Sequence, residues 1–347
     1  MKQNMNQWIE AILDSSVKPA LPLLSQPASQ LLGINSAELL YNSSLRAQGM
    51  KQIAEYAPMP AVFDLMDLAL EAECFGAKAH LSKDGLPVIS APLICSREDA
   101  ELLEIPEVGS GRSRIALETA SKALTFITDR PVFSCITGPF TLAGCLMGIS
   151  EIMLFCLDDP DMVDVVLEKA SAFLINYCLA LKNLGVHGIL LAEPLAGLIS
   201  PLFAEKFSAR YVKLIVHSLQ DENFIFIYHN CGNFSLKQID SILSIGARVL
   251  HFGNSIKMEQ MLTYIPDTIP VLGNLDPVSQ FRNGSPASVY QKTMLLLKAC
   301  ANRKNFLPSS GCDIPSSASW ENIDAFFQAV SDYYSSFPAS LQSFGSF

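Results

Sequence analysis

From about residue 130 onward, the chain repeats one pattern of positions: a short apolar run, then small or polar residues, then a longer amphipathic stretch. This alternation is typical of β-α units, whose strands lie parallel in one sheet. The apolar runs predict strands at 131–136, 188–193, 224–229, 248–252, 270–275 and 305–309. The amphipathic stretches predict helices at 159–184, 203–219, 235–245, 286–302 and 319–335.

Upstream of this repeat, the pattern is less regular. Residues 61–67 predict an earlier strand, and residues 77–90 alternate like a β-hairpin with an Asp-Gly dipeptide at its turn. Residues 1–60 predict two or three helices. The serine-rich tail over residues 336–347 is expected to be loose.

We therefore expect one domain over residues 1–347, with the α/β fold of a (β/α)8 TIM barrel. In this interpretation residues 1–60 form a helical cap segment, and residues 61–335 form the barrel with an early β-hairpin insertion. A doubly wound open sheet is the alternative. That fold usually marks its ligand site with a G-x-G-x-x-G motif or a P-loop, and neither follows the first predicted strand.

The composition narrows the classes of partner. Half of the 347 residues are hydrophobic and 17% are charged, which supplies enough apolar surface for a large core. The net charge of -10 repels phosphate backbones, so no nucleic-acid partner is expected. No apolar run reaches the length of a membrane span, and the N-terminus is too polar for a signal peptide. We therefore expect a cytoplasmic protein with no membrane partner, in which most of the nine cysteines are reduced core residues.

A histidine and two cysteines follow predicted strands and have glycines nearby. His229 and Cys231 lie in Tyr-His-Asn-Cys-Gly-Asn at the end of one strand, and Cys312 lies in Ser-Ser-Gly-Cys-Asp-Ile-Pro after the last one. In an α/β barrel the carboxyl ends of all strands open on one face, so these side chains can reach a common centre. Nitrogen and sulfur ligands with an open fourth position suit a catalytic zinc ion. Ordinary inert cysteines in strand-end loops are the alternative on the residues alone.

The order of these motifs resembles that of the zinc-dependent methyltransferases that act with corrinoid proteins. This group is a branch of the uroporphyrinogen decarboxylase family, typified by methylcobalamin:coenzyme M methyltransferase. The likeness extends over nearly the whole chain, through the motifs PLLSQPASQLLGI, FDLMDLALEAECFGAKAHL, ITGPFTLAGCLMG, LAEPLAG, YHNCGN, VLGNLDP and SSGCDIP. The H-x-C motif and the final cysteine are specific to the zinc branch, so the resemblance implies that His229, Cys231 and Cys312 bind zinc.

The resemblance also implies an activity. Members of this branch transfer a methyl group from methylcobalamin, carried by a corrinoid-binding protein, to a small-molecule thiol substrate. Zinc favours the thiolate over the thiol, and a thiolate is the nucleophile that attacks a methyl group. We therefore expect methyl transfer through a zinc-bound thiolate, with zinc and a corrinoid as cofactors.

Uroporphyrinogen decarboxylation is the main alternative, since decarboxylases share the family. They carry paired arginines in an R-Q-A-G-R segment near the N-terminus, which hold propionate side chains. The corresponding region here has Ser25, Gln26, Ala28 and Ser29, and no arginine precedes Arg46. Without these cations a porphyrinogen with many carboxylates is poorly neutralised, so this function is less favoured. A family member that binds zinc without catalysis is a third interpretation.

Four further polar residues at strand ends complete the candidate site. Glu193 is a candidate ligand, orienting residue or proton acceptor, because a carboxylate is costly in an apolar run. His251 stands where family members place an acidic residue, and it is a candidate either for the fourth zinc position or for a hydrogen bond to a ligand. Asn274 and Asp276 are expected to line the pocket, although an Asp-Pro pair also forms turns.

Overall fold

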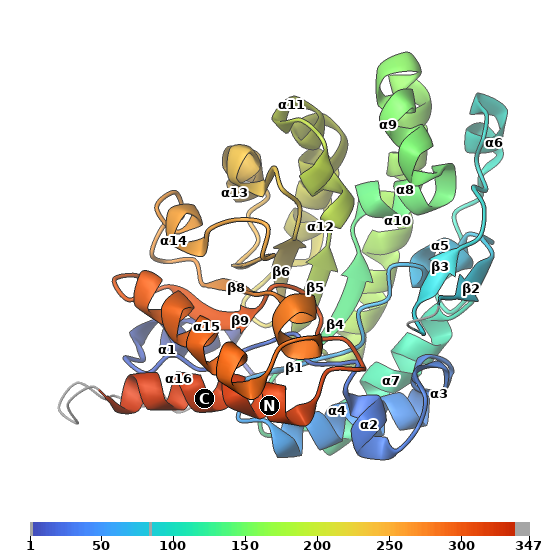
Figure 1. Ribbon diagram of the computed structural model, residues 1–347. Coiled ribbons are helices and arrows are strands. Elements are labelled where there is room, and N and C mark those ends of the chain that lie inside the picture. The colour runs from blue at the N-terminus through green and yellow to red at the C-terminus, as the bar shows by residue number, and fades with distance from the viewer. Residues whose placement is uncertain (1–2, 83–84, 337–347) are drawn as a thin grey trace.

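The computed structural model describes residues 3–82 and 85–336. Its centre is a curled sheet of seven parallel strands that lie in chain order, with each strand paired to the next (Figure 1). The strands are β1 (Val62–Phe63), β4 (Val132–Thr137), β5 (Gly188–Ala192), β6 (Ile225–Asn230), β7 (Val249–Phe252), β8 (Val271–Leu275) and β9 (Phe306–Ser310). All of the predicted parallel strands are present. The strand order runs in one direction around the sheet, which contradicts the doubly wound alternative.

The prediction of eight strands is wrong for the described part of the chain, which forms seven in this sheet. Residues 20–25, buried throughout, occupy the gap between the edge strands β9 and β1. The Leu21 N–H donates to the Pro308 carbonyl at 2.9 Å, and Leu24 lies in a small cavity wall together with Phe63 of β1. Pro22 has no N–H to donate, which prevents a regular ladder here. An irregular segment therefore takes the place of the eighth strand.

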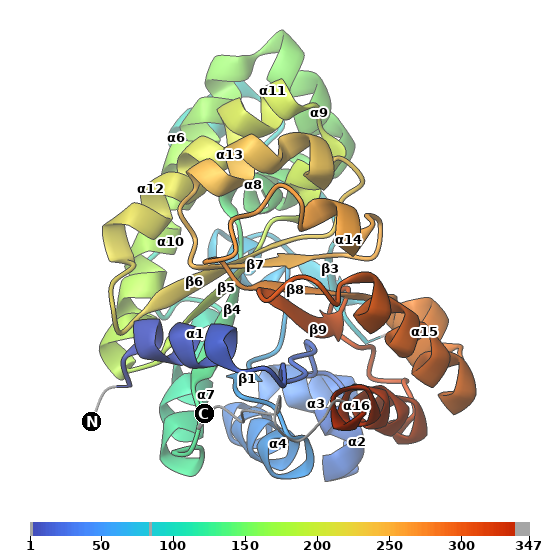
Figure 2. The ribbon, with the colours of Figure 1, turned by 90° about the vertical axis from the view of Figure 1, so that its left-hand side faces the viewer.

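Helices surround the outside of the sheet (Figures 1 and 2). They follow the predicted β-α alternation and comprise α7 (Ser113–Phe126), α8 (Pro139–Met147), α9 (Ile149–Asp158), α10 (Pro160–Leu184), α11 (Pro201–Ala204), α12 (Arg210–Leu219), α13 (Ile239–Ser244), α14 (Met258–Met261), α15 (Pro286–Ala299) and α16 (Trp320–Ser335). The Asp159 side chain caps α10 by accepting from the Met162 N–H, and Gly185, with φ of 101°, ends it. Among the described residues no single helix is long and apolar enough to cross a membrane, although α8 and α9 together meet that test across a bend of 102°.

The N-terminal residues form four helices, α1 (Met5–Asp14), α2 (Ala28–Leu32), α3 (Ser36–Tyr41) and α4 (Ser43–Tyr56). Helix α1 lies at the amino-terminal end of the sheet, where the Trp8 Nε1–H donates to the Pro60 carbonyl just before β1. Two short helices, α5 (Leu70–Cys74) and α6 (Arg97–Leu102), follow β1.

Between α5 and α6, β2 (Ala79–Leu81) and β3 (Pro87–Ile89) pair antiparallel. Asp84, predicted at the turn between these two strands, lies outside the described residues. The tail predicted over residues 336–347 also lies outside them from residue 337 onward.

Two buried arginines neutralise carboxylates beside β1. Arg46 makes a two-pronged contact with Asp64, at 2.6 and 2.9 Å. Arg112 pairs with both Asp67 and Glu73. Removing one member of such a pair would leave a buried charge unpaired, so these contacts fix the position of the chain where it leaves β1.

Candidate metal centre

The candidate ligands lie at the carboxyl ends of two strands that are not neighbours. His229 is the second-to-last residue of β6, where it pairs in register with His251 of β7. Cys231 directly follows β6, and Cys312 follows β9 by two residues. Because all of these strands are parallel and the sheet is curled, their carboxyl ends converge, and residues 83 positions apart in sequence come into contact.

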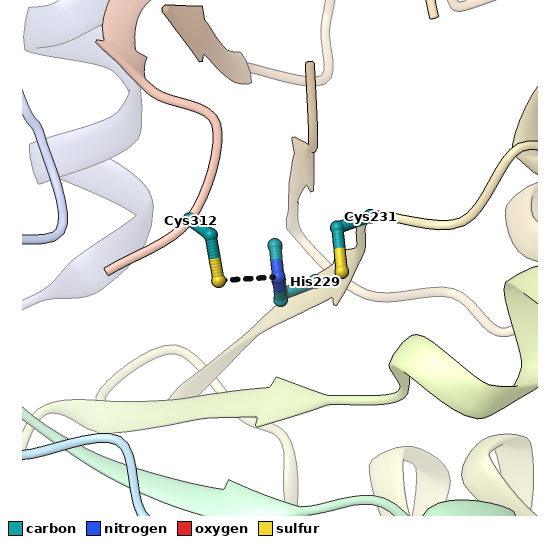
Figure 3. Close-up of side chains that lie close together, drawn as sticks. All are labelled: His229, Cys231 and Cys312. Carbon is teal, nitrogen blue, oxygen red and sulfur yellow. Dashed lines mark hydrogen bonds between the residues drawn. The ribbon is translucent and has the colours of Figure 1, made fainter. Parts of the chain in front are cut away.

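The three side chains point toward one another (Figure 3). The Nε2 atom of His229 lies 3.7 Å from the Sγ atom of Cys312, and the ligand atoms of His229, Cys231 and Cys312 all lie within 4.8 Å of one another. Tetrahedral zinc with bonds of about 2.3 Å to sulfur and about 2.0 Å to nitrogen separates such atoms by about 3.6 Å. The set of donors and their spacing therefore fit a zinc ion, as the sequence predicts.

Close backbone packing holds Cys231 in this position. A Cβ atom at Gly253, which follows β7, would lie 2.4 Å from the Cβ of Cys231. A Cβ at Gly232 would lie 2.3 Å from the backbone of Gly197. Any larger residue at either place would displace the loop that carries Cys231.

The two thiols of the cluster differ from the other cysteines in their electrostatics. The hydrogen bond from Cys312 lowers the pKa of Cys231. The same contact, followed by burial, raises the pKa of Cys312. For Cys145, Cys156 and Cys300, burial alone is the largest effect and raises the pKa to about 12. Cys156 and Cys300 are buried, in agreement with their prediction as core residues, and Cys145 is half-buried.

His251 contacts the histidine of the cluster rather than joining the group of candidate ligands. Its Nδ1 atom lies 2.7 Å from Nδ1 of His229, and its Nε2 atom lies 3.2 Å from the Oγ atom of Ser309. Burial, together with the neighbouring His229, holds the pKa of His251 well below its usual value. Of the two roles open for His251 from the sequence, the geometry favours the hydrogen bond to a ligand.

The backbone N–H of Glu193 donates to the His229 carbonyl, but its carboxylate is not in the group of candidate ligands and instead binds the start of a helix. Its fully buried carboxylate accepts hydrogen bonds from the Phe140 N–H, from the N–H and hydroxyl of Thr141, and from the Ser208 hydroxyl. Phe140 and Thr141 are in the first turn of α8, where a negative charge is stabilised by the helix dipole. Burial raises the pKa of Glu193, and these hydrogen bonds oppose the rise. The arrangement favours an orienting, structural role for Glu193.

Asn274 and Asp276 also make local structural contacts. The Asn274 amide donates to the carbonyls of Gly253 and Ile256, at 2.9 Å each, and so holds the loop after β7. The Asp276 carboxylate accepts from the backbone of Val278 and Ser279, and it caps the π-helix Pro277–Arg282. Within the described part of the chain, neither residue belongs to the lining of the large cavity described next.

A cavity of about 800 Å³ opens beside Cys312. Its walls include residues of the hairpin, of the start of α3 and of the loop after β9. Asp313 in this wall accepts from the backbone and hydroxyl of Ser25 and from the amide of Gln26. Burial raises the pKa of Asp313 to about 6. The sequence analysis did not single out Ser309, in the buried end of β9, or Asp313, in the loop that follows, although both are polar residues within three positions of Cys312.

The fold and the site together define an α/β-barrel-like protein with a candidate His-Cys-Cys metal centre. The chain belongs to the uroporphyrinogen decarboxylase (URO-D) family, which matches residues 19–333. This confirms the family inferred from the sequence motifs.

The proteins that are similar to this chain in sequence include methyltransferases. A methylated-thiol–coenzyme M methyltransferase of Methanosarcina mazei is 25% identical, over 91% of this chain and 85% of its own length. The methylcobamide:CoM methyltransferase MtbA of Methanosarcina acetivorans is 27% identical, over 77% of this chain and 78% of its own. A solved methyltransferase from Methanosarcina mazei superposes with a TM-score of 0.81 at 20% identity, over 95% of this chain and 99% of that one, which shows a shared fold.

We predict that the protein, purified without chelator or added metal, contains about one zinc ion per chain. Cys231→Ser and Cys312→Ser should each lose the metal, because each removes a thiolate ligand. The exposed Cys95 provides the control, and Cys95→Ser should keep a full complement of zinc. Elemental analysis measures the content, and a wild-type protein that is fully active without metal would contradict the prediction.

We predict that Glu193→Ala destabilises the fold while leaving the zinc content of the folded protein unchanged. The substitution leaves four buried donors without an acceptor. Each unsatisfied buried group costs about 1–3 kcal/mol, so the free energy of unfolding should fall by at least about 3 kcal/mol. Denaturant titration measures the loss. Stability equal to that of the wild type, combined with lost zinc, would instead make Glu193 a ligand.

Proposed function

We propose that this chain is a methyltransferase that moves a methyl group from a methylated corrinoid protein to a small thiol, with zinc bound by His229, Cys231 and Cys312. The observation that carries the proposal is the convergence of one imidazole and two thiols within 4.8 Å of one another, with Cys312 in the wall of a large cavity. The names of the methyltransferase relatives support the methylcobamide donor and the thiol acceptor.

The bound zinc would lower the pKa of an acceptor thiol and so supply a thiolate at neutral pH. The residues of the chain hold and balance that centre. Cys231 and Cys312, as thiolates, would neutralise the charge of a divalent ion, and His229 would add a neutral nitrogen. Three protein ligands would leave one position open for the acceptor, as is usual in catalytic rather than structural zinc sites.

The cavity beside Cys312 is suited to a small acceptor. A volume of about 800 Å³ lies within the range of small-molecule sites. Because Cys312 is itself in the wall, we expect an acceptor thiol bound in the cavity to lie next to the candidate metal centre. The methyl donor, by contrast, arrives on a separate protein and must approach the same opening.

The cavity disfavours uroporphyrinogen, the substrate of the alternative activity. Among the described residues of its lining, Arg282 is the one cation, whereas Asp67 and Asp313 are carboxylates. Gln26 occupies the segment where decarboxylases carry arginines, and it binds Asp313 instead. A substrate with many carboxylates would find too little positive charge here. A zinc-binding protein without catalysis is the other alternative, which an activity assay excludes or supports.

We predict methyl transfer from free methylcobalamin to a small thiol such as 2-mercaptoethanesulfonate. Cys312→Ser should reduce the rate at least about 100-fold, since it removes a metal ligand. The change in the absorption spectrum of the corrinoid on demethylation measures the rate, and Cys95→Ser serves as the control variant. Zinc-loaded protein without activity toward any thiol in a broad panel would leave the non-catalytic alternative.

We also predict that uroporphyrinogen is turned over negligibly, because Arg282 is the one cation among the described residues of the cavity lining. Chromatography of the porphyrins after oxidation measures the coproporphyrinogen formed, with a true decarboxylase as the reference. Product formation at a rate near that of the reference would show that the decarboxylase branch is the correct one.

A further inference from the structure

A histidine pair lies behind the candidate metal centre. His229 and His251 are register partners on β6 and β7, and their rings are 4.6 Å apart at an angle of 64°. The two Nδ1 atoms lie 2.7 Å apart, which is a hydrogen-bond distance. Both side chains are at most 1% exposed, so water does not compete for this contact.

The positions of the protons follow from this geometry. The Nε2 atom of His229 faces Cys312, so as a metal ligand it carries no proton, and the neutral ring holds its proton on Nδ1. Nδ1 of His251 must then accept that proton in a hydrogen bond. The remaining proton of His251 is on Nε2, from which it is donated to the Ser309 hydroxyl at 3.2 Å.

We propose that His251 is a positioning residue that fixes the tautomer and orientation of the ligand His229 by accepting a hydrogen bond at Nδ1. This inference rests on the metal centre of the proposed function. Ligating histidines usually donate their second N–H to a carboxylate, a backbone carbonyl or water. Here a neutral imidazole accepts that hydrogen bond and adds no negative charge beside a centre that must bind a thiolate.

The same contacts link the two strands that deliver the ligands. Ser309 is in β9, three residues before Cys312, and His229 is in β6. His251 bonds to both, and it therefore spans the space between the two sources of ligands. We expect this bridge to maintain the separation of His229 Nε2 and Cys312 Sγ, which the structure places 3.7 Å apart.

Two variants of similar size and polarity separate this role from a merely structural one. In His251→Asn the amide oxygen can take the place of Nδ1, so the acceptor for His229 is kept. In His251→Gln the amide nitrogen can take the place of Nε2, so the contact to Ser309 is kept and the acceptor is lost. Zinc affinity is measured by competition with a chromophoric chelator, and thermal unfolding of each metal-free variant controls for stability.

We expect His251→Gln to weaken zinc binding about 10–100-fold and His251→Asn to keep an affinity close to that of the wild type. Equal affinities in the two variants would overturn the proposal. So would X-ray absorption showing that His251→Asn loses an imidazole from the metal, since His251 would then be a ligand. The contrast does not depend on methyl transfer. If the two variants differ in zinc affinity as expected but the wild type transfers no methyl group, the proposed function is overturned and the role of His251 is not.

Discussion

The parallel pairing of β6 through β9 is the constraint on which the candidate site depends. Each strand starts at the same end of the sheet, so the residue that ends a strand is delivered to one edge whatever its position in the sequence. His229, His251 and Ser309 lie at this edge for that reason, and Cys312 lies three residues after Ser309, in the loop that follows β9. A shift of one residue in any of these pairings would turn a ligand away from the others, because alternate side chains point to opposite faces.

Buried charge is the second constraint, and the fold meets it with specific partners. Arg46 and Arg112 neutralise carboxylates after β1, and Glu193 is satisfied by donors at the start of α8. Such groups hold loops in fixed positions because moving them would leave a charge without a partner in an apolar interior. These contacts therefore hold the chain where it leaves β1 and where α8 begins.

The sequence predicts the strands, most helices and the His229, Cys231 and Cys312 cluster, because apolar periodicity and strand-end motifs are local signals. It does not predict that residues 20–25 replace a strand, since this depends on a contact with Pro308 at the far end of the chain. The role of Glu193 is hidden for the same reason. Its partners Thr141 and Ser208 come from different β-α units. From the sequence alone, a single carboxylate at a strand end is therefore as consistent with a metal ligand as with a helix cap.

The segment of residues 20–25 has a consequence for the order of folding. Leu21 and Leu23 bond to β9, and Ser25 binds Asp313, so the wall of the barrel closes between residues 20–25 and residues 306–313. Contacts of such large sequence separation form slowly. During synthesis residues 20–25 lack their β9 partners until β9 has left the ribosome, and the candidate metal centre, which includes Cys312, comes together at the same stage. Barrel closure and the convergence of His229, Cys231 and Cys312 are thus one late event.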